Sequence, residues 1–295
     1  VLLHDLITAY NDCGCLTPAV QYKDYSEWQK EQLSGEKMQK QELYWLQQFA
    51  GEVPVLNLPP DYTRPDFQSF EGETLRYELD AALGAAVKGF ARDNRVSMFM
   101  LLLSAYYILL KKYTGQEDIV VGSPASGRNH PDLEGTVGML VNSLALRNRP
   151  SGSKSFRLFL QEVRQSILDA QENQDYPFES LVERLGLTRD MSRNPIFDTM
   201  FVMQNIPVPD LKQSNFELEL YPLNNRIAKF DLTFFVWERA DKLCFEIEYC
   251  TSLFKRETIR QLWMHFVNIL AEVTAKPDIR LGDIMMLDKL EKERL

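Results

Sequence analysis

The sequence predicts a fold of the α/β class (mixed α+β), in which helices flank a mixed β-sheet. The run 98–110 is apolar apart from Ser104, which is typical of a buried helix and too short to span a bilayer. Residues 118–122 follow as a short β-branched run, typical of a buried strand. Residues 230–238 and 243–249 alternate around a short turn and predict a hairpin. Helices interleaved with strands favour layers of both kinds over a bundle.

The remaining elements follow from the same two periodicities. The buried helix extends over 97–113. We expect further helices over 2–10, 22–49, 81–93, 155–172, 177–185 and 254–273, and further strands over 74–79, 139–147 and 197–203. Gly115 and Gly186 stand where left-handed helix caps are expected. Residues 51–72 hold four prolines and little periodicity, so they are the best boundary candidate. We therefore expect three parts: 1–72, 73–276 and 277–295.

Composition narrows the function classes. The formal net charge of −9 argues against a nucleic-acid or anionic-membrane surface. Four cysteines are too few for a disulfide scaffold, and Cys13 and Cys15 have no second ligand pair at zinc spacing. The start lacks a basic n-region and a small-residue cleavage site. We expect a cytoplasmic protein without a metal.

The inventory of catalytic side chains is thin. The three histidines, His4, His130 and His265, are isolated from one another, and no phosphate-binding glycine loop is present. His130 lies in a polar loop over 123–135, where ligand contacts are more frequent than in a packed helix. His265 fits a packed or exposed helix position better than a catalytic base.

Two polar clusters stand out because each runs into a proline. Residues 173–175 precede Pro177, and residues 189–194 precede Pro195, so both clusters lie at element boundaries. The helix between them begins at Pro177. Such corners suit either two well-capped turns or loops locked around a cleft.

Four stretches in order carry a family resemblance. They are YKDYSEW at 22–28, VGMLVNSLALR at 137–147, NQDYPFE at 173–179 and RDMSRNP at 189–195. Together they resemble core motifs of the condensation domains of nonribosomal peptide synthetases. That family resembles chloramphenicol acetyltransferase, with two lobes forming a V around a tunnel. The resemblance makes 1–72 bridging helices and linker, 73–276 a C-terminal lobe, and 277–295 a linker toward an adenylation domain.

The resemblance also implies roles for single residues. The family's catalytic His-His-x-x-x-Asp-Gly run is not in this chain; we expect it just before Val1, and we expect the chain alone to be inactive. Asn142 corresponds to a motif asparagine near the catalytic base, where an amide could orient a thioester carbonyl or donate to an oxyanion. Loop candidates are Arg128 and His130. Structural or tunnel-lining candidates are Tyr22, Asp24, Trp28, Asp175, Tyr176, Arg189, Arg193 and Asp231. Residues 122–135 match the tunnel floor, and residues 204–220 match a latch to the other lobe.

The implied reaction is peptide-bond formation. The amine of an acceptor aminoacyl thioester would attack a donor aminoacyl or peptidyl thioester, both held on phosphopantetheine arms of carrier domains. No cofactor would bind the chain directly. The expected partners are peptidyl and aminoacyl carrier domains, the adenylation domain and the missing N-terminal lobe, without nucleic acid or membrane. The alternatives are a non-catalytic lobe that serves as a docking platform, and an epimerisation or other acyltransferase domain of the same fold.

Overall fold

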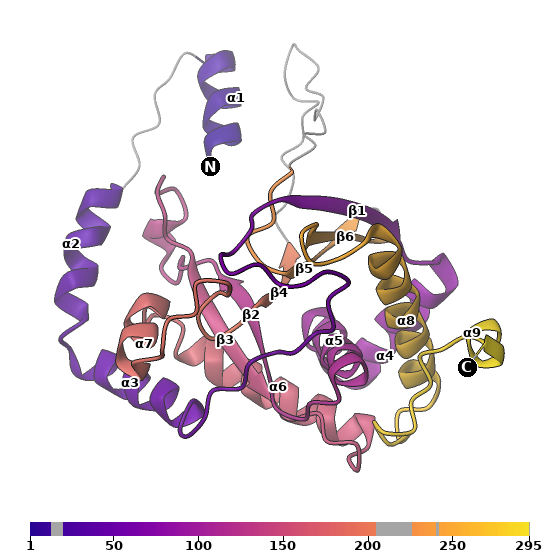
Figure 1. Cartoon of the computed structure of the whole chain (residues 1–295). Coiled ribbons are helices and arrows are strands. Elements are labelled where there is room, and N and C mark those ends of the chain that lie inside the picture. The colour runs from indigo at the N-terminus through magenta and orange to yellow at the C-terminus, as the bar shows by residue number, and fades with distance from the viewer. Residues whose placement is uncertain (13–19, 205–225, 240–241, 295) are drawn as a thin grey trace.

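The computed structural model describes residues 1–12, 20–204, 226–239 and 242–294, and Figure 1 shows their arrangement. The helices within these ranges are α1 (Leu2–Asp12), α2 (Tyr22–Gln32), α3 (Glu36–Gln48), α4 (Ala81–Asp93), α5 (Met98–Thr114), α6 (Phe156–Glu172), α7 (Phe178–Leu185), α8 (Arg256–Ala275) and α9 (Lys289–Arg294). The strands are β1 (Gly72–Glu78), β2 (Ile119–Ala125), β3 (Asn142–Asn148), β4 (Thr199–Gln204), β5 (Leu232–Arg239) and β6 (Lys242–Cys250), and Pro131–Leu133 form a 3-10 turn.

The strands of the described ranges form one mixed sheet in the order β1-β6-β5-β4-β2-β3. The β5–β6 hairpin, the β1–β6 pair and the β2–β3 pair are antiparallel. The two central pairings, β2 with β4 and β4 with β5, are parallel. The predicted mixed sheet flanked by helices is therefore confirmed.

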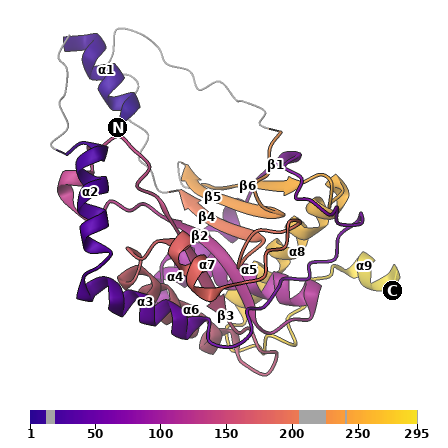
Figure 2. The same cartoon turned by 60° about the vertical axis from the view of Figure 1, so that its left-hand side comes forward.

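Helices α4, α5, α6 and α8 cover one face of this sheet, as Figure 2 shows in a turned view. The predicted buried helix is confirmed, since residues 100–110 of α5 are all buried. The predicted alternation of β6 also holds, because Leu243, Phe245, Ile247 and Tyr249 are each at most 1% exposed. Phe245 packs against Trp263 of α8 with ring centroids 4.9 Å apart. Burial of apolar surface of this kind is the main stabilising term of the lobe.

One predicted element is wrong. The expected single helix over 22–49 is two helices, α2 and α3, separated by residues 33–35. Gly35 stands before α3 with an extended backbone (φ −77°, ψ 158°), and glycine disfavours a helix interior by about 1 kcal/mol relative to alanine. The apolar stripe of the two halves was also incomplete, so packing does not enforce a continuous helix.

Other differences are shifts of element ends. β2 continues to Ala125, and β3 begins at Asn142 instead of 139. Gly115 and Gly186 have the expected left-handed backbone, with φ of 72° and 57°. The latch candidate over 204–220 lies outside the described residues except for Gln204.

The proline-rich segment after α3 runs extended along the body. Leu56 and Leu58 are buried in the main core, and the backbone N–H of Asn57 donates to Gln116 Oε1 at 2.8 Å. The segment is thus packed along its middle, and the division of the chain at residue 72 stays a prediction.

No single helix in the described ranges is long and apolar enough to cross a membrane. The pair α4 and α5 meets the length and composition test together, but the two helices are bent by 111°.

Candidate functional site: a cavity between α2 and the 126–136 loop

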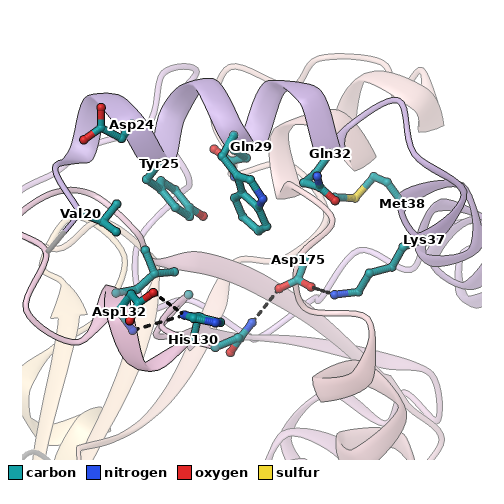
Figure 3. A pocket seen from close by; sticks show the side chains of 14 residues that line it. Val20, Asp24, Tyr25, Gln29, Gln32, Lys37, Met38, His130, Asp132 and Asp175 are labelled. Atoms are coloured by element: carbon teal, nitrogen blue, oxygen red, sulfur yellow. Dashed lines mark hydrogen bonds and ion pairs between the residues drawn. The ribbon is translucent and has the colours of Figure 1, made fainter.

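A cavity of about 490 Å3 opens between α2 and the loop that follows β2. Figure 3 shows Tyr25 reaching from α2 toward His130 on the loop, with Lys37 and Asp175 at one end. Tyr25, Met38 and Leu133 contribute buried apolar surface to the lining. An apolar cleft with a few convergent polar groups is the usual form of a small-molecule site.

The start of α2 is fixed to the loop by close packing. The ring of Tyr22 covers Gly138, where a Cβ would lie 2.3 Å from the ring. Tyr25 forms a small buried cluster with Leu133 and Leu140, and Thr136 Oγ1 donates to the carbonyl of Val20 at 2.8 Å. The cavity wall is therefore anchored to its floor at one end.

At the other end of the cavity, Asp175 hydrogen-bonds to both α3 and the loop. Its carboxylate accepts from Lys37 Nζ at 2.7 Å and from Asn129 Nδ2 at 2.6 Å. Lys37 belongs to α3 and Asn129 to the loop, so one side chain links both walls. Trp45 of α3 donates its indole N–H to the carbonyl of Asn173 at 2.8 Å, which holds the same corner against α3.

Predicted site residues on α2 have different surroundings. Asp24 and Trp28 line the cavity, and Trp28 is 52% exposed. Asp24 also accepts the backbone N–H of Gln21 at 3.1 Å, which completes a capping box at the start of α2. Burial, followed by the nearby Asp175 carboxylate, raises the pKa of Tyr25, so its phenol stays neutral.

Asn142, the candidate catalytic support, has its amide fully engaged. Nδ2 donates to the carbonyls of Gln174 and Tyr176 at 2.8 and 2.7 Å. Oδ1 accepts the backbone N–H groups of Ser143 and Phe178 at 2.9 and 3.1 Å. The side chain clamps the 174–178 corner onto β3, and an oxyanion role would require one of these bonds to open.

The loop candidates shape the loop itself. Arg128 donates to the carbonyls of Leu133 and Thr136, the latter at 2.9 Å. His130 Nδ1 accepts the N–H of Asp132 at 3.3 Å and caps the 3-10 turn. Its side chain is 67% exposed and lines the cavity, so it can reach a ligand there.

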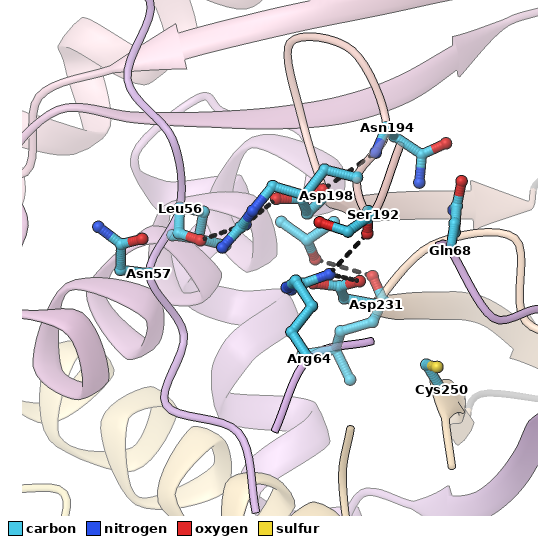
Figure 4. A network of polar contacts seen from close by, with 12 residues as sticks. Leu56, Asn57, Arg64, Gln68, Ser192, Asn194, Asp198, Asp231 and Cys250 are labelled. Atoms are coloured by element: carbon cyan, nitrogen blue, oxygen red, sulfur yellow. Dashed lines mark hydrogen bonds and ion pairs between the residues drawn. The ribbon is translucent and has the colours of Figure 1, made fainter. Parts of the chain in front are cut away.

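The second polar corner is a separate network, drawn in Figure 4. Arg193 pairs with Asp198 and donates to the carbonyl of Leu56 at 3.1 Å. Arg64 pairs with Asp231 through both terminal guanidinium nitrogens and also donates to the carbonyl of Ser192 at 3.1 Å. Burial and then the neighbouring Asp231 raise the pKa of Asp198, while Arg193 opposes them. Two partly buried Arg–Asp pairs thus hold the corner, and the fork of Arg64 bonds both oxygens of its carboxylate.

The two corners do not form one site. The 173–175 corner belongs to the cavity, whereas Arg193 and Asp231 lie in the second network, and Arg189 is exposed on the same loop. Tyr176 is buried, with its carbonyl bonded to Asn142. Sequence reasoning missed Lys37, Asn129 and Arg64, because their partners lie far away along the chain. For Lys37, the absence of a carboxylate three or four residues away on its helix was the available signal.

Metal and base chemistry have few candidates here. Among the residues that the structure describes, no group of three or more His, Cys, Asp or Glu could hold a metal ion. His265 is buried on α8, as one of the two expected alternatives, and bonds Tyr113 and Glu291.

The family model of the condensation domain matches residues 1–295, and the chain belongs to this family. Bacitracin synthase 3 of Bacillus licheniformis is 45% identical over 295 residues, which cover 100% of this chain and 5% of that protein. Tyrocidine synthase 3 of Brevibacillus parabrevis is also 45% identical over 295 residues, covering 100% of this chain and 4% of that protein. The chain thus spans a small part of the length of these curated relatives.

A solved structure shares the fold. A crystal structure of a holo four-domain nonribosomal peptide synthetase bound to AMP and glycine superposes with a TM-score of 0.88 at 20% identity. The match covers 99% of this chain and 23% of that chain. The expected chloramphenicol-acetyltransferase-like lobe is therefore confirmed.

Proposed function

We propose that this chain is part of a domain that joins two carrier-bound aminoacyl or peptidyl thioesters through a peptide bond in nonribosomal peptide synthesis. The observation that carries the proposal is the meeting of three stretches at one cavity. Trp28 comes from 22–28, His130 from the loop before 137–147, and Asp175 from 173–179. Trp28 and Asp175 belong to stretches whose wording resembles the family, and His130 lies in the loop that leads into a third such stretch; the fold brings all three to one cavity.

The cavity is suited to hold an acyl chain or a thioester arm. Its apolar wall of Tyr25, Met38 and Leu133 would pack on methylene groups, while Asn129, His130 and the Lys37–Asp175 pair offer hydrogen bonds. Phosphopantetheine on a carrier domain has this mixed character, so the substrates would arrive on carrier domains. No cofactor of the chain itself is needed, and the compartment would be the cytoplasm.

The chemical step would need a base from outside the chain. The amine must lose a proton as it attacks the thioester carbonyl, and the family's catalytic His-His-x-x-x-Asp-Gly run is not in this chain. His265 is buried against Tyr113 and Glu291, and His130, although it lines the cavity, has its Nδ1 engaged by the N–H of Asp132. We therefore propose that residues 1–295 alone do not turn over and that Asn142 acts by holding the corner.

The test is a condensation assay with two carrier domains, each loaded with an aminoacyl thioester. The synthetase that contains this chain should form a dipeptidyl thioester detectable by mass spectrometry, while residues 1–295 alone should form none. Turnover by residues 1–295 alone would contradict the external base.

A synthetase that forms no product in this assay would contradict peptide-bond formation. The alternative, a platform that only docks neighbouring domains, is favoured by the lack of an acid–base set on the described residues. It predicts that isolated carrier domains bind the chain and that the synthetase containing it forms no peptide bond at this domain.

A further inference from the structure

One face of α8 carries a polar stripe outside the cavity. The stripe consists of Gln261, His265, Asn268 and Glu272. Their intervals of four, three and four residues place them on the same side of the helix. All four hydrogen-bond to one later segment of the chain, residues 285–294, which we call the strap.

The strap runs antiparallel to α8. The backbone N–H of Met285 donates to Glu272 Oε2 at 2.5 Å. Asn268 Nδ2 then donates to the carbonyl of Met286 at 2.8 Å. Further on, Glu291 meets His265 and Gln261, so the strap covers about 16 Å of α8 at 1.5 Å per residue.

The strap begins from a fixed point. The N–H groups of Leu281 and Gly282 donate to the carbonyls of Lys154 and Gly152, each at 2.9 Å. Leu281 and Ile284 are buried in the core. Residues 281–284 therefore hold one end of the strap, and the contact at Glu291 decides where the other end lies.

Glu291 is held by a recess that fits a carboxylate. His265 is 2% exposed, its Nδ1 is 2.7 Å from the Tyr113 hydroxyl, and its Nε2 is 3.1 Å from both carboxylate oxygens of Glu291. Gln261 Nε2 donates to the same carboxylate at 2.9 Å. Hydrogen bonds to a charged group are about twice as strong as neutral ones.

Glu291 also shapes the strap locally. Its backbone N–H donates to Asp288 Oδ1 at 2.7 Å, and its carboxylate accepts the N–H of Asp288 at 3.0 Å. This reciprocal pair is a capping box at the start of α9. The Glu291 carboxylate thus both caps the start of α9 and hydrogen-bonds α9 to α8.

We propose that Gln261 and His265 form a carboxylate-binding site, occupied by Glu291 of the same chain, which docks the strap along α8. Docking fixes the direction in which the chain leaves the lobe, beside the amino-terminal half of α8. The site takes a side-chain carboxylate presented at the first turn of a helix. This assignment does not depend on the proposed peptide-bond formation.

Glu291→Gln tests the site with little change of shape. Glutamine can still close the capping box, so the variant removes the charge and leaves the local helix signal. Glu293→Gln is the matched control, because Glu293 is exposed on the same short helix. Release of the strap can be measured by limited proteolysis, since trypsin cuts after Lys289 and Lys292.

Cleavage after these two lysines in the native chain should be about five- to tenfold faster in Glu291→Gln than in wild type, and unchanged in Glu293→Gln. Amide hydrogen exchange over 285–294 should rise in the same variant only. Equal protection in wild type and Glu291→Gln, or an equal loss in both variants, would overturn the proposal. So would faster cleavage throughout the chain, because it would show a global effect rather than release of the strap.

Discussion

Tyr22 of α2 lies against Gly138 of the loop before β3 so closely that a Cβ at Gly138 would be 2.3 Å from the Tyr22 ring. Both residues belong to stretches that carry the family resemblance. The absence of a side chain at 138 lets the helix approach the loop, and this contact fixes the start of α2, a wall of the cavity, against that loop. A small residue here is a packing requirement, because Gly138 does not have a positive φ.

Gly138→Ala should displace the start of α2. The added methyl must move an aromatic ring or the helix, and overpacking of this kind destabilises by about 1–3 kcal/mol. Urea denaturation measures the change in the free energy of unfolding. Gly135→Ala is the control, because a Cβ at Gly135 meets nothing within 4 Å. Equal effects in both variants would show that the Tyr22 contact is unimportant.

Asn142→Asp should destabilise the fold by about 1–3 kcal/mol at neutral pH. The new carboxylate would face the carbonyls of Gln174 and Tyr176, which now accept from the amide at 2.8 and 2.7 Å. Asn57→Asp is the control, because Asn57 is exposed although its neighbours are buried. Thermal unfolding and kcat in the intact synthetase are both measured. A lowered kcat with unchanged stability would instead indicate a direct catalytic role for Asn142.

Arg64→Met should cost about 3–5 kcal/mol of stability, because it leaves the Asp231 carboxylate buried without its partner. The side chains are 19% and 10% exposed, so solvent cannot replace the lost pair. Adding Asp231→Asn should recover part of the loss in a double-mutant cycle. Arg157→Met, which breaks the exposed pair with Asp278, should change stability by about 1 kcal/mol or less. Equal losses of stability in Arg64→Met and Arg157→Met would contradict the prediction that the Arg64–Asp231 pair stabilises the fold more than an exposed pair does.

The stability of the folded chain should depend on pH through the ionisation of Glu117. The Lys111 ammonium, then the N–H of Gly152, lower the pKa of Glu117 from 4.5 to about 2. A depressed carboxyl pKa stabilises the folded chain above 4.5, and this contribution is lost as the pH falls toward 2. Glu117→Gln should therefore lower stability near neutral pH, by less than about 1 kcal/mol because the Glu117 side chain is 51% exposed.

The difference between wild type and Glu117→Gln should shrink as the pH falls from 4.5 through 2 and vanish below that, since both side chains are then uncharged. Thermal unfolding at several pH values measures it. A difference that stays constant across this range would contradict a charge effect and indicate lost hydrogen-bond geometry.

Local signals predicted most of the elements. The apolar run in α5, the alternation in β6 and the glycines after α5 and α7 each carry their information within a few residues. The break between α2 and α3 was missed, because Ser34 and Gly35 are only a weak stop signal within a strongly helix-forming stretch.

The site was predicted only in part. Asp175 and Asn142 could be picked out by the wording of their stretches, but their partners could not. Lys37 and Asn129 meet Asp175 only after α3 and the loop have packed onto the same corner. Arg64 reaches Asp231 across 167 positions of the chain, so no local pattern indicates the pair.

The sequence by itself determined the fold class and the local elements, because periodicity, caps and turn residues act over a few positions of the chain. The family was indicated by the resemblance of four motif stretches. Tertiary structure decided which polar side chains share a site. It separated the Asp175 corner, which faces the cavity, from the Arg193 corner, which is a buried ion-pair network. It also brought the carboxylate of Glu291 within hydrogen-bonding distance of His265 Nε2. Such pairings depend on which buried surfaces meet, and this depends on the packing of the whole core.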